Sequence, residues 1–181
     1  DGWVDLFIGN ESSDRVHPCQ LYRNNGDGTF ADVAEEAGVA VTGYVKGVSC
    51  GDYNNDGLLD LYVSCLMGPN LLFVNRGKDD SGRWTFADVS REAGVTEPLD
   101  SFPTWFWDYD NDGWLDIFVS GYRANSGDIA ADYLNLPTEA ERARLYRNNR
   151  DGTFTDVTVR VRLYTVMYSM GANFGDLDSD G

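Results

Sequence analysis

A nine-residue pattern of acidic residues and glycine constrains this chain more than any other feature. Its form is Asp-x-Asn/Asp-x-Asp-Gly-x-x-Asp, and it occurs complete at residues 52–60 and 108–116. Residues 1–5 match the second half of a third copy, and residues 176–181 match the first half of a fourth. Calcium prefers several oxygen ligands at short range, and the Gly permits the sharp bend that such a loop needs. The pattern therefore predicts calcium loops, two of them complete.

The expected ligands are the oxygen side chains at alternate positions, the closing carboxylate and the backbone carbonyl of the seventh residue. The first complete loop has three carboxylates and one amide, whereas the second has four carboxylates. Other things being equal, we expect the second site to bind calcium more tightly. The predicted ligands are Asp52, Asn54, Asp56, Leu58 and Asp60 in the first loop, Asp108, Asp110, Asp112, Trp114 and Asp116 in the second, and Asp1, Trp3, Asp5, Asp176, Asp178 and Asp180 in the partial copies.

The residues that follow the loops predict strands rather than helices. A helix–loop–helix calcium site needs Glu at the twelfth position, where this chain has Val63 and Val119. Segments 59–64 and 115–120 alternate and are rich in β-branched and aromatic residues. The loops are therefore expected to connect strands.

A second pattern, called the marker pattern, recurs between the loops, at residues 21–33, 72–89 and 145–157. In each unit, the Asp that precedes the next loop Gly lies 26 positions after the Phe. The arm from the loop to the Phe varies in length. One arm of the repeat is therefore fixed, and the other accepts insertions.

Each repeat accommodates four short strands, expected at 45–51, 59–65, 70–75 and 85–89 in the second unit. Residues 104–107, Thr-Trp-Phe-Trp, are bulky on both faces, as expected when a sheet lies between neighbours. Four antiparallel strands repeated at this period are typical of β-propeller blades. We therefore expect an all-β partial β-propeller over residues 1–181, with units at approximately 1–44, 45–101 and 102–165 and the start of a further unit at 166–181.

Two segments depart from the repeat. Short turns closed by Gly38 and Gly94 follow two of the marker patterns, but residues 158–163 contain no Gly and alternate, which favours an extended segment. In the long arm, residues 124–143, a Thr-Glu-Ala-Glu capping box predicts a short inserted helix from Ala140 to Leu145. Because variable loops on a rigid scaffold commonly carry binding, this insertion is a candidate recognition surface. An inert surface excursion is the alternative.

Composition and charge agree with this interpretation. The apolar fraction of 42% supports a sizeable core, and the net charge is −16. Twelve of the 30 acidic residues lie at loop positions, so four bound dications would leave a charge of about −8. The acidity therefore argues against nucleic acid and anionic membrane surfaces as partners. No stretch of 18 apolar residues predicts a membrane span.

Cysteine and catalytic patterns give little direction. Cys19, Cys50 and Cys65 make an odd count without zinc spacing. A disulfide between Cys50 and Cys65 is possible, but two buried thiols are the preferred interpretation. His17 is the single histidine and fits an ordinary loop residue. No nucleophile elbow, phosphate loop or zinc motif is found, so we do not expect an enzyme.

The chain resembles the FG-GAP/VCBS repeat proteins, whose calcium-loop blades also build the integrin α-subunit propeller. It is most similar to the secreted, cartilage-acidic-protein-like branch that often ends in an ASPIC/UnbV domain. The resemblance implies a seven-bladed ring, calcium in the hairpin loops and a location outside the cytoplasm. It does not imply one shared activity. The segments that carry the resemblance are residues 21–30, 51–57 and 170–176.

These features together predict a calcium-binding propeller module that is secreted, cell-surface or periplasmic and binds a protein or carbohydrate ligand. One alternative is a propeller enzyme acting on polysaccharide, with catalytic residues largely outside this segment. Another is a structural subunit of a surface assembly. Because both ends fall within loop patterns and three repeats do not close a ring, we expect the rest of the chain or other subunits to cover the two ends.

Overall fold

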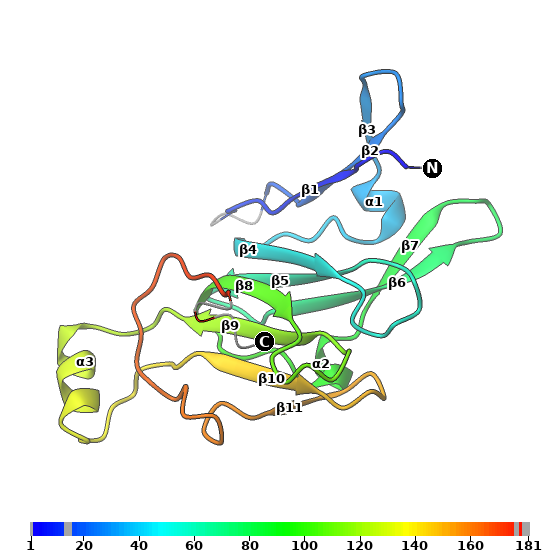
Figure 1. The fold of residues 1–181 in the computed structure, drawn as a ribbon. Helices are drawn as coiled ribbons and strands as arrows, with labels where there is room; N and C mark the ends of the chain where they lie inside the picture. Colours follow the sequence, from blue (N-terminus) through cyan, green and yellow to red (C-terminus); the bar gives the residue numbers. More distant parts are fainter. Residues whose placement is uncertain (1, 13–15, 176–177, 179–181) are drawn as a thin grey trace.

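The computed structural model describes residues 2–12, 16–175 and 178, which form three antiparallel sheets in succession along the chain (Figure 1). Each sheet is a meander in which every strand pairs with its neighbour in sequence. No helix in the described residues is long and apolar enough to cross a membrane. The strands are β1 (Leu6–Ile8), β2 (Gln20–Asn24) and β3 (Phe30–Asp32) in the first sheet, β4 (Tyr44–Gly51), β5 (Asp60–Leu66), β6 (Leu71–Lys78) and β7 (Trp84–Asp88) in the second, and β8 (Ser101–Trp107), β9 (Asp116–Gly121), β10 (Arg144–Asn148) and β11 (Phe154–Asp156) in the third; the helices are α1 (Ala34–Ala37), α2 (Ser90–Ala93) and α3 (Ser126–Tyr133).

The acidic loops connect strands, as the sequence predicts. Gly51 pairs with Asp60 at the end of the β4–β5 hairpin, and Trp107 pairs with Asp116 at the end of β8–β9. The strands expected in the second unit are found within a few residues of their predicted bounds. The all-β fold of propeller-like, four-stranded antiparallel blades is thereby confirmed. The seven-bladed ring stays a prediction.

The core lies between the sheets, because strand side chains alternate between the two faces. In β5, Leu61 and Val63 join a buried cluster with Cys19, which precedes β2, and the strand residues Phe7 and Leu21 of the first sheet pack against this cluster. Tyr62, on the opposite face, joins a second cluster with Phe106 and other residues of the third sheet. The second sheet therefore fills two cores.

Residues 158–163 form a tight turn, so the expectation of an extended segment is wrong. Val161 N–H donates to Val157 O at 3.0 Å, as Ala93 N–H does to Val89 O at 2.8 Å in α2. Arg162 has φ of +64° at the position that Gly94 occupies with φ of +77°. In the absence of a glycine, a side-chain hydrogen bond holds this turn in place. Thr158 Oγ1 accepts Leu145 N–H at 2.8 Å, as Ser90 Oγ accepts Leu72 N–H in the second sheet.

The inserted helix exists but lies earlier than predicted. Asn125 caps α3 by accepting Gly127 and Asp128 N–H, and the Asp128 carboxylate accepts Asn125 N–H in return. The predicted helix from Ala140 to Leu145 is wrong, because Leu145 is buried in β10 and pairs with Phe118. Glu141, expected to complete a capping box, instead accepts backbone N–H groups of residues 99 and 100.

The cysteines are free thiols, of which Cys19 and Cys65 are buried and Cys50 is exposed. The prediction of two buried thiols is therefore right for Cys65 and wrong for Cys50. Cys50 pairs with Leu61 and Cys65 with Val45, so the two residues are not opposite each other in the hairpin.

Candidate metal centre

The first carboxylate of each acidic loop accepts backbone N–H groups from later residues of the same loop. Asp52 accepts Asp56 N–H at 3.1 Å and Gly57 N–H at 2.9 Å. In the second loop, Asp108 makes the equivalent bonds to the N–H groups of residues 112 and 113, at 3.0 and 2.8 Å. The loop glycines have φ of +86° and +85°, a conformation that strains residues with a Cβ. The two loops therefore share one backbone fold.

The closing carboxylate of each loop is buried between strands. Asp60 accepts Tyr53 N–H at 3.3 Å and Asn75 N–H at 2.8 Å. Asp116 accepts Tyr109 N–H at 3.0 Å and Asn148 N–H at 2.8 Å. Burial raises the pKa of both carboxyl groups to about 6, although these backbone donors lower it.

The partial copy at the N-terminus has the same closing contact, because Asp5 accepts Asn24 N–H at 2.8 Å. The partners are thus a recurring Asn at positions 24, 75 and 148. Sequence reasoning did not identify these Asn residues as part of the site. Their place in the recurring marker pattern was the available indication.

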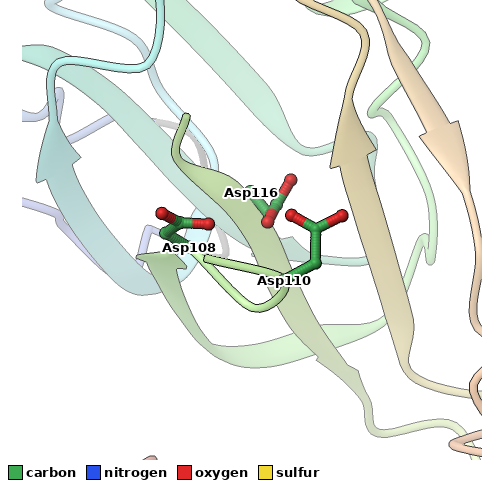
Figure 2. A group of neighbouring side chains, drawn as sticks. All are labelled: Asp108, Asp110 and Asp116. Atoms are coloured by element: carbon green, nitrogen blue, oxygen red, sulfur yellow. The ribbon is translucent and has the colours of Figure 1, made fainter. Parts of the chain in front are cut away.

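Three carboxylates of the second loop converge around the turn between β8 and β9, as Figure 2 shows. Asp108, Asp110 and Asp116 each offer an oxygen within 4.8 Å of the other two. Oxygens that share one calcium at about 2.3–2.6 Å lie at such separations. The donor set therefore fits a hard cation.

The amide Asn54 takes the place of Asp110 in the first loop. Its Oδ1 accepts Asp56 N–H at 3.0 Å, and Asp56 Oδ1 accepts Leu58 N–H at 2.9 Å. In the second loop, Asp112 accepts Trp114 N–H at 3.0 Å in the same way. Of the partial copies, Trp3 and Asp178 are exposed. The carbonyl ligands at Trp3, Leu58 and Trp114 stay predictions. Asp1, Asp176 and Asp180 lie outside the described residues.

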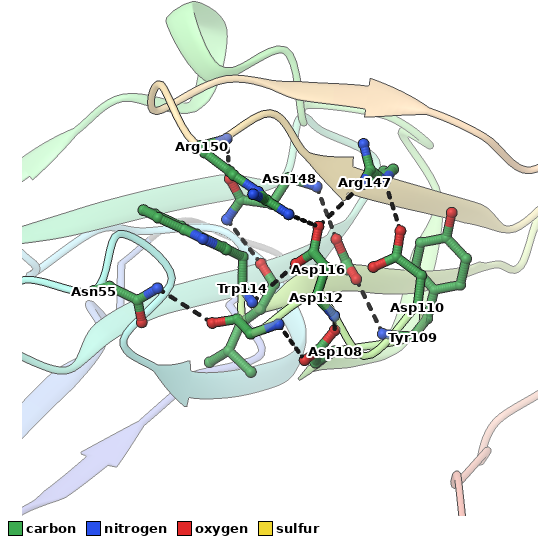
Figure 3. A network of polar contacts seen from close by, with 12 residues as sticks. Asn55, Asp108, Tyr109, Asp110, Asp112, Trp114, Asp116, Arg147, Asn148 and Arg150 are labelled. Carbon is green, nitrogen blue, oxygen red and sulfur yellow. Dashed lines mark hydrogen bonds and ion pairs between the residues drawn. The ribbon is translucent and has the colours of Figure 1, made fainter. Parts of the chain in front are cut away.

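The two complete loops touch each other. Asn55 Nδ2 donates to Gly113 O at 3.2 Å. Asn148 Nδ2 donates to Tyr53 O at 2.8 Å in one loop and to Leu115 O at 3.0 Å in the other. A side chain of the third sheet therefore connects both candidate sites. Figure 3 shows Asn148 beside the second loop and the contact of Asn55 with that loop.

Residues 1–63 and 108–181 match the family of FG-GAP-like repeats. The chain belongs to the FG-GAP-like repeat family. This confirms the resemblance seen in the sequence and agrees with the repeated hairpin loops.

Among individual FG-GAP proteins, the chain is similar to cartilage acidic protein 1. It is 34% identical to the protein of Homo sapiens and 32% identical to that of Xenopus tropicalis, each over 126 residues. The match covers 67% of this chain and 18% of each relative, so the chain spans less than a fifth of their length.

Proposed function

We propose that this chain is a calcium-binding FG-GAP module of an extracellular protein, with a binding rather than a catalytic role. The observation that carries the proposal is the convergence of Asp108, Asp110 and Asp116 within 4.8 Å at a hairpin loop. Like carboxylates held together repel one another, and a dication relieves that repulsion. Similarity to cartilage acidic protein 1 supports the extracellular location.

Calcium titration tests this function. We expect two binding events at the complete loops and a melting temperature that falls when a chelator is added. A ligand that binds only the folded state stabilises it, by about 2.7 kcal/mol at one hundred times its Kd. The variants D52N and D108N each remove one ligand charge and should each remove one event. D79N, at a partly exposed carboxylate that pairs with Arg83 outside the acidic loops, is the control. A melting temperature indifferent to chelator, with no heat of binding, contradicts the proposal.

The insertion supports a protein partner. It presents apolar side chains to solvent on α3 and the turn that follows, with Tyr133 86% and Leu134 62% exposed. Contiguous exposed apolar residues mark interaction surfaces. The insertion is also held rigidly, since Asp132 pairs with Arg142 at 2.5 Å and accepts Val166 N–H at 3.1 Å. A firm frame with an apolar tip suits recognition.

Substitution of the tip tests this role better than deletion, because deletion would also break the contacts of Asp132 and Glu141. We expect Y133S/L134S to keep the melting temperature of the parent, since both side chains are exposed, and to lose partner binding. The measurement is quantitative affinity capture from extracellular proteins of the source organism by parent and variant. If the parent and Y133S/L134S capture the same proteins in equal amounts, the tip has no recognition role.

A second candidate function, polysaccharide hydrolysis, is favoured by one cavity of about 470 Å³. Its lining includes Asp100, Asp128 and Glu139, together with Tyr122, whose ring stacks on Tyr168 with 4.4 Å between centroids. Two of these carboxylates have structural contacts: Asp100 accepts Met67 N–H, and Asp128 caps α3. Binding is therefore the better-supported role. Release of reducing sugar from a polysaccharide panel, abolished by E139Q, would favour the enzyme instead.

A further inference from the structure

Two arginines of the β10–β11 hairpin lie against the outer carboxylates of the second loop (Figure 3). Arg147 Nε is 2.7 Å from Asp110 Oδ2, and its Nη2 is 3.0 Å from Asp112 Oδ2. Arg150 Nη2 is 2.8 Å from the same oxygen of Asp112. The loop therefore carries two positive charges supplied by a different hairpin.

These contacts engage both oxygens of Asp112. Oδ2 accepts the two guanidinium groups, and Oδ1 accepts Trp114 N–H at 3.0 Å. Accordingly, the carboxylates that converge in this loop are those of Asp108, Asp110 and Asp116. A cation that takes Asp112 as a fourth ligand must rearrange the arginine contacts.

The first loop has no counterpart of these arginines at the equivalent positions. Asn75 and Asn148 are equivalent, because each donates its backbone N–H to the closing carboxylate. Counting from these Asn residues, Val74 stands where the third sheet has Arg147, and Gly77 stands where it has Arg150. Arg76 acts electrostatically on Tyr53 of the first loop, but in the described part of the chain it forms no ion pair with the carboxylates of that loop. One chain therefore holds the same acidic loop with and without guanidinium ion pairs.

We propose that Arg147 and Arg150 are built-in competitors of the cation at the second loop, so that this loop binds calcium more weakly than the first. The inference rests on the proposed function of both loops as calcium sites. It reverses the order that the number of carboxylates alone suggests.

The charges explain the direction. Four carboxylates less two guanidinium charges give the second loop a net charge of −2, against −3 for the three carboxylates of the first loop. A dication approaching the second loop is also repelled by the two guanidinium groups at short range. Both effects weaken binding there. The first loop would stay filled at calcium levels that leave the second partly empty.

Calorimetric titration of calcium into the full chain and its variants tests the inference. In R147Q/R150Q we expect the second loop to bind calcium about tenfold more tightly, because two repulsive charges are gone. The control R83Q/R144Q removes the same total charge at ion pairs outside the two loops. R150G copies the first loop and suits the backbone, since Arg150 has φ of +66°. It should tighten binding in part.

Terbium luminescence assigns the change to one loop. Trp114 lies inside the second loop and sensitises a bound lanthanide, whereas the first loop has Leu58 there. Trp3 occupies the matching position of the partial copy, so only the emission that is lost in W114F is assigned to the second loop. The W114F-sensitive part should rise at lower terbium concentration in R147Q/R150Q than in the parent.

The outcomes separate the two ideas. If calcium binds both loops of the parent and R147Q/R150Q binds within twofold, the arginine inference fails and the calcium function stands. Equal tightening in the R83Q/R144Q control also overturns the inference, because net charge alone would then explain the change. If neither parent nor variants bind calcium or terbium at any loop, both ideas fail.

Discussion

Asp60 and Asp116 are carboxylates that the fold buries almost completely, with 0% and 1% of their surfaces exposed. Each accepts backbone N–H groups from two different segments. A buried charge needs such partners or a cation. The closing aspartates are therefore structural acceptors as well as candidate ligands, whereas Asn54 is only a candidate ligand with one bond inside its own loop.

Chelator separates these two roles. We expect D60A to lower the free energy of unfolding by about 2–4 kcal/mol even in excess chelator, because two backbone donors lose a charged acceptor. N54A should cost less than about 1 kcal/mol under the same conditions, because its bond lies in an exposed loop. Urea denaturation with and without chelator measures both. Equal costs for the two variants would show that Asp60 acts only through metal.

Thiol labelling reports the environment of the cysteines. Burial raises the pKa of the Cys65 thiol to about 11, and the charge of Cys19 adds a smaller effect in the same direction. Burial also raises the pKa of the Cys19 thiol. A raised pKa stabilises the neutral thiol, so this contribution is present below about pH 9 and is lost as pH rises toward 11. At pH 8 we expect rapid modification of Cys50 alone, and of all three after unfolding. Rapid labelling of Cys65 in the native protein contradicts the buried position.

At the scale of elements, one turn geometry occurs three times with different sequences. The first two copies close with Gly38 and Gly94, and the third closes with Arg162 at φ of +64°. A residue with a Cβ is strained in this conformation. Bonds around Thr158 hold the third turn in place: its Oγ1 donates to Asp156 at 2.5 Å and accepts Leu145 N–H at 2.8 Å.

Glycine at this position should stabilise the third turn. We expect R162G to raise the free energy of unfolding by about 1 kcal/mol, since it relieves the left-handed strain. G94A is the opposite substitution at the equivalent site and should lower it by a similar amount. Thermal denaturation of both variants measures the pair. A destabilising R162G would indicate that the arginine side chain contributes more than the strain costs.

Sequence patterns predict elements well where the repeat fixes them and poorly where it does not. The strands that flank the acidic loops are predicted by the alternation of their side chains and by the spacing of the loops. Packing between the sheets favours the same strands. The insertion contains two capping patterns, at Asn125 and at Thr138, and the sequence does not decide between them. Burial of Leu145 in β10 excludes the helix after Thr138. The arginine contacts at Asp112 depend on the pairing of β9 with β10, which residue type alone does not reveal.

At the scale of the whole molecule, Asn148 connects the second and third sheets. It is 2% exposed, and its Nδ2 bridges Tyr53 O and Leu115 O. The equivalent Asn75 donates to Leu59 O at 3.2 Å within its own sheet. The bond to Tyr53 therefore links one blade to the next.

Paired alanine substitutions isolate that link. We expect N148A to cost about 2–3 kcal/mol, because the buried carbonyl of Tyr53 and the partly buried carbonyl of Leu115 lose their donor. N75A should cost at least about 1 kcal/mol less, since its side chain is more exposed. Chemical denaturation provides both values, and similar losses for the two variants would exclude an energetic role of the link between sheets.

The position of β5 between two cores sets an order of opening for the molecule. Leu61 and Val63 are covered by the first sheet, and Tyr62 is covered by the third. An amide in β5 becomes exposed to solvent only when packing on both of its sides is lost, whereas β1 separates from a single interface among the described residues. Hydrogen exchange should therefore be slowest at residues 61–63 and faster toward β1. We therefore expect the sheets to open one after another from the ends of the stack, with the middle sheet opening last.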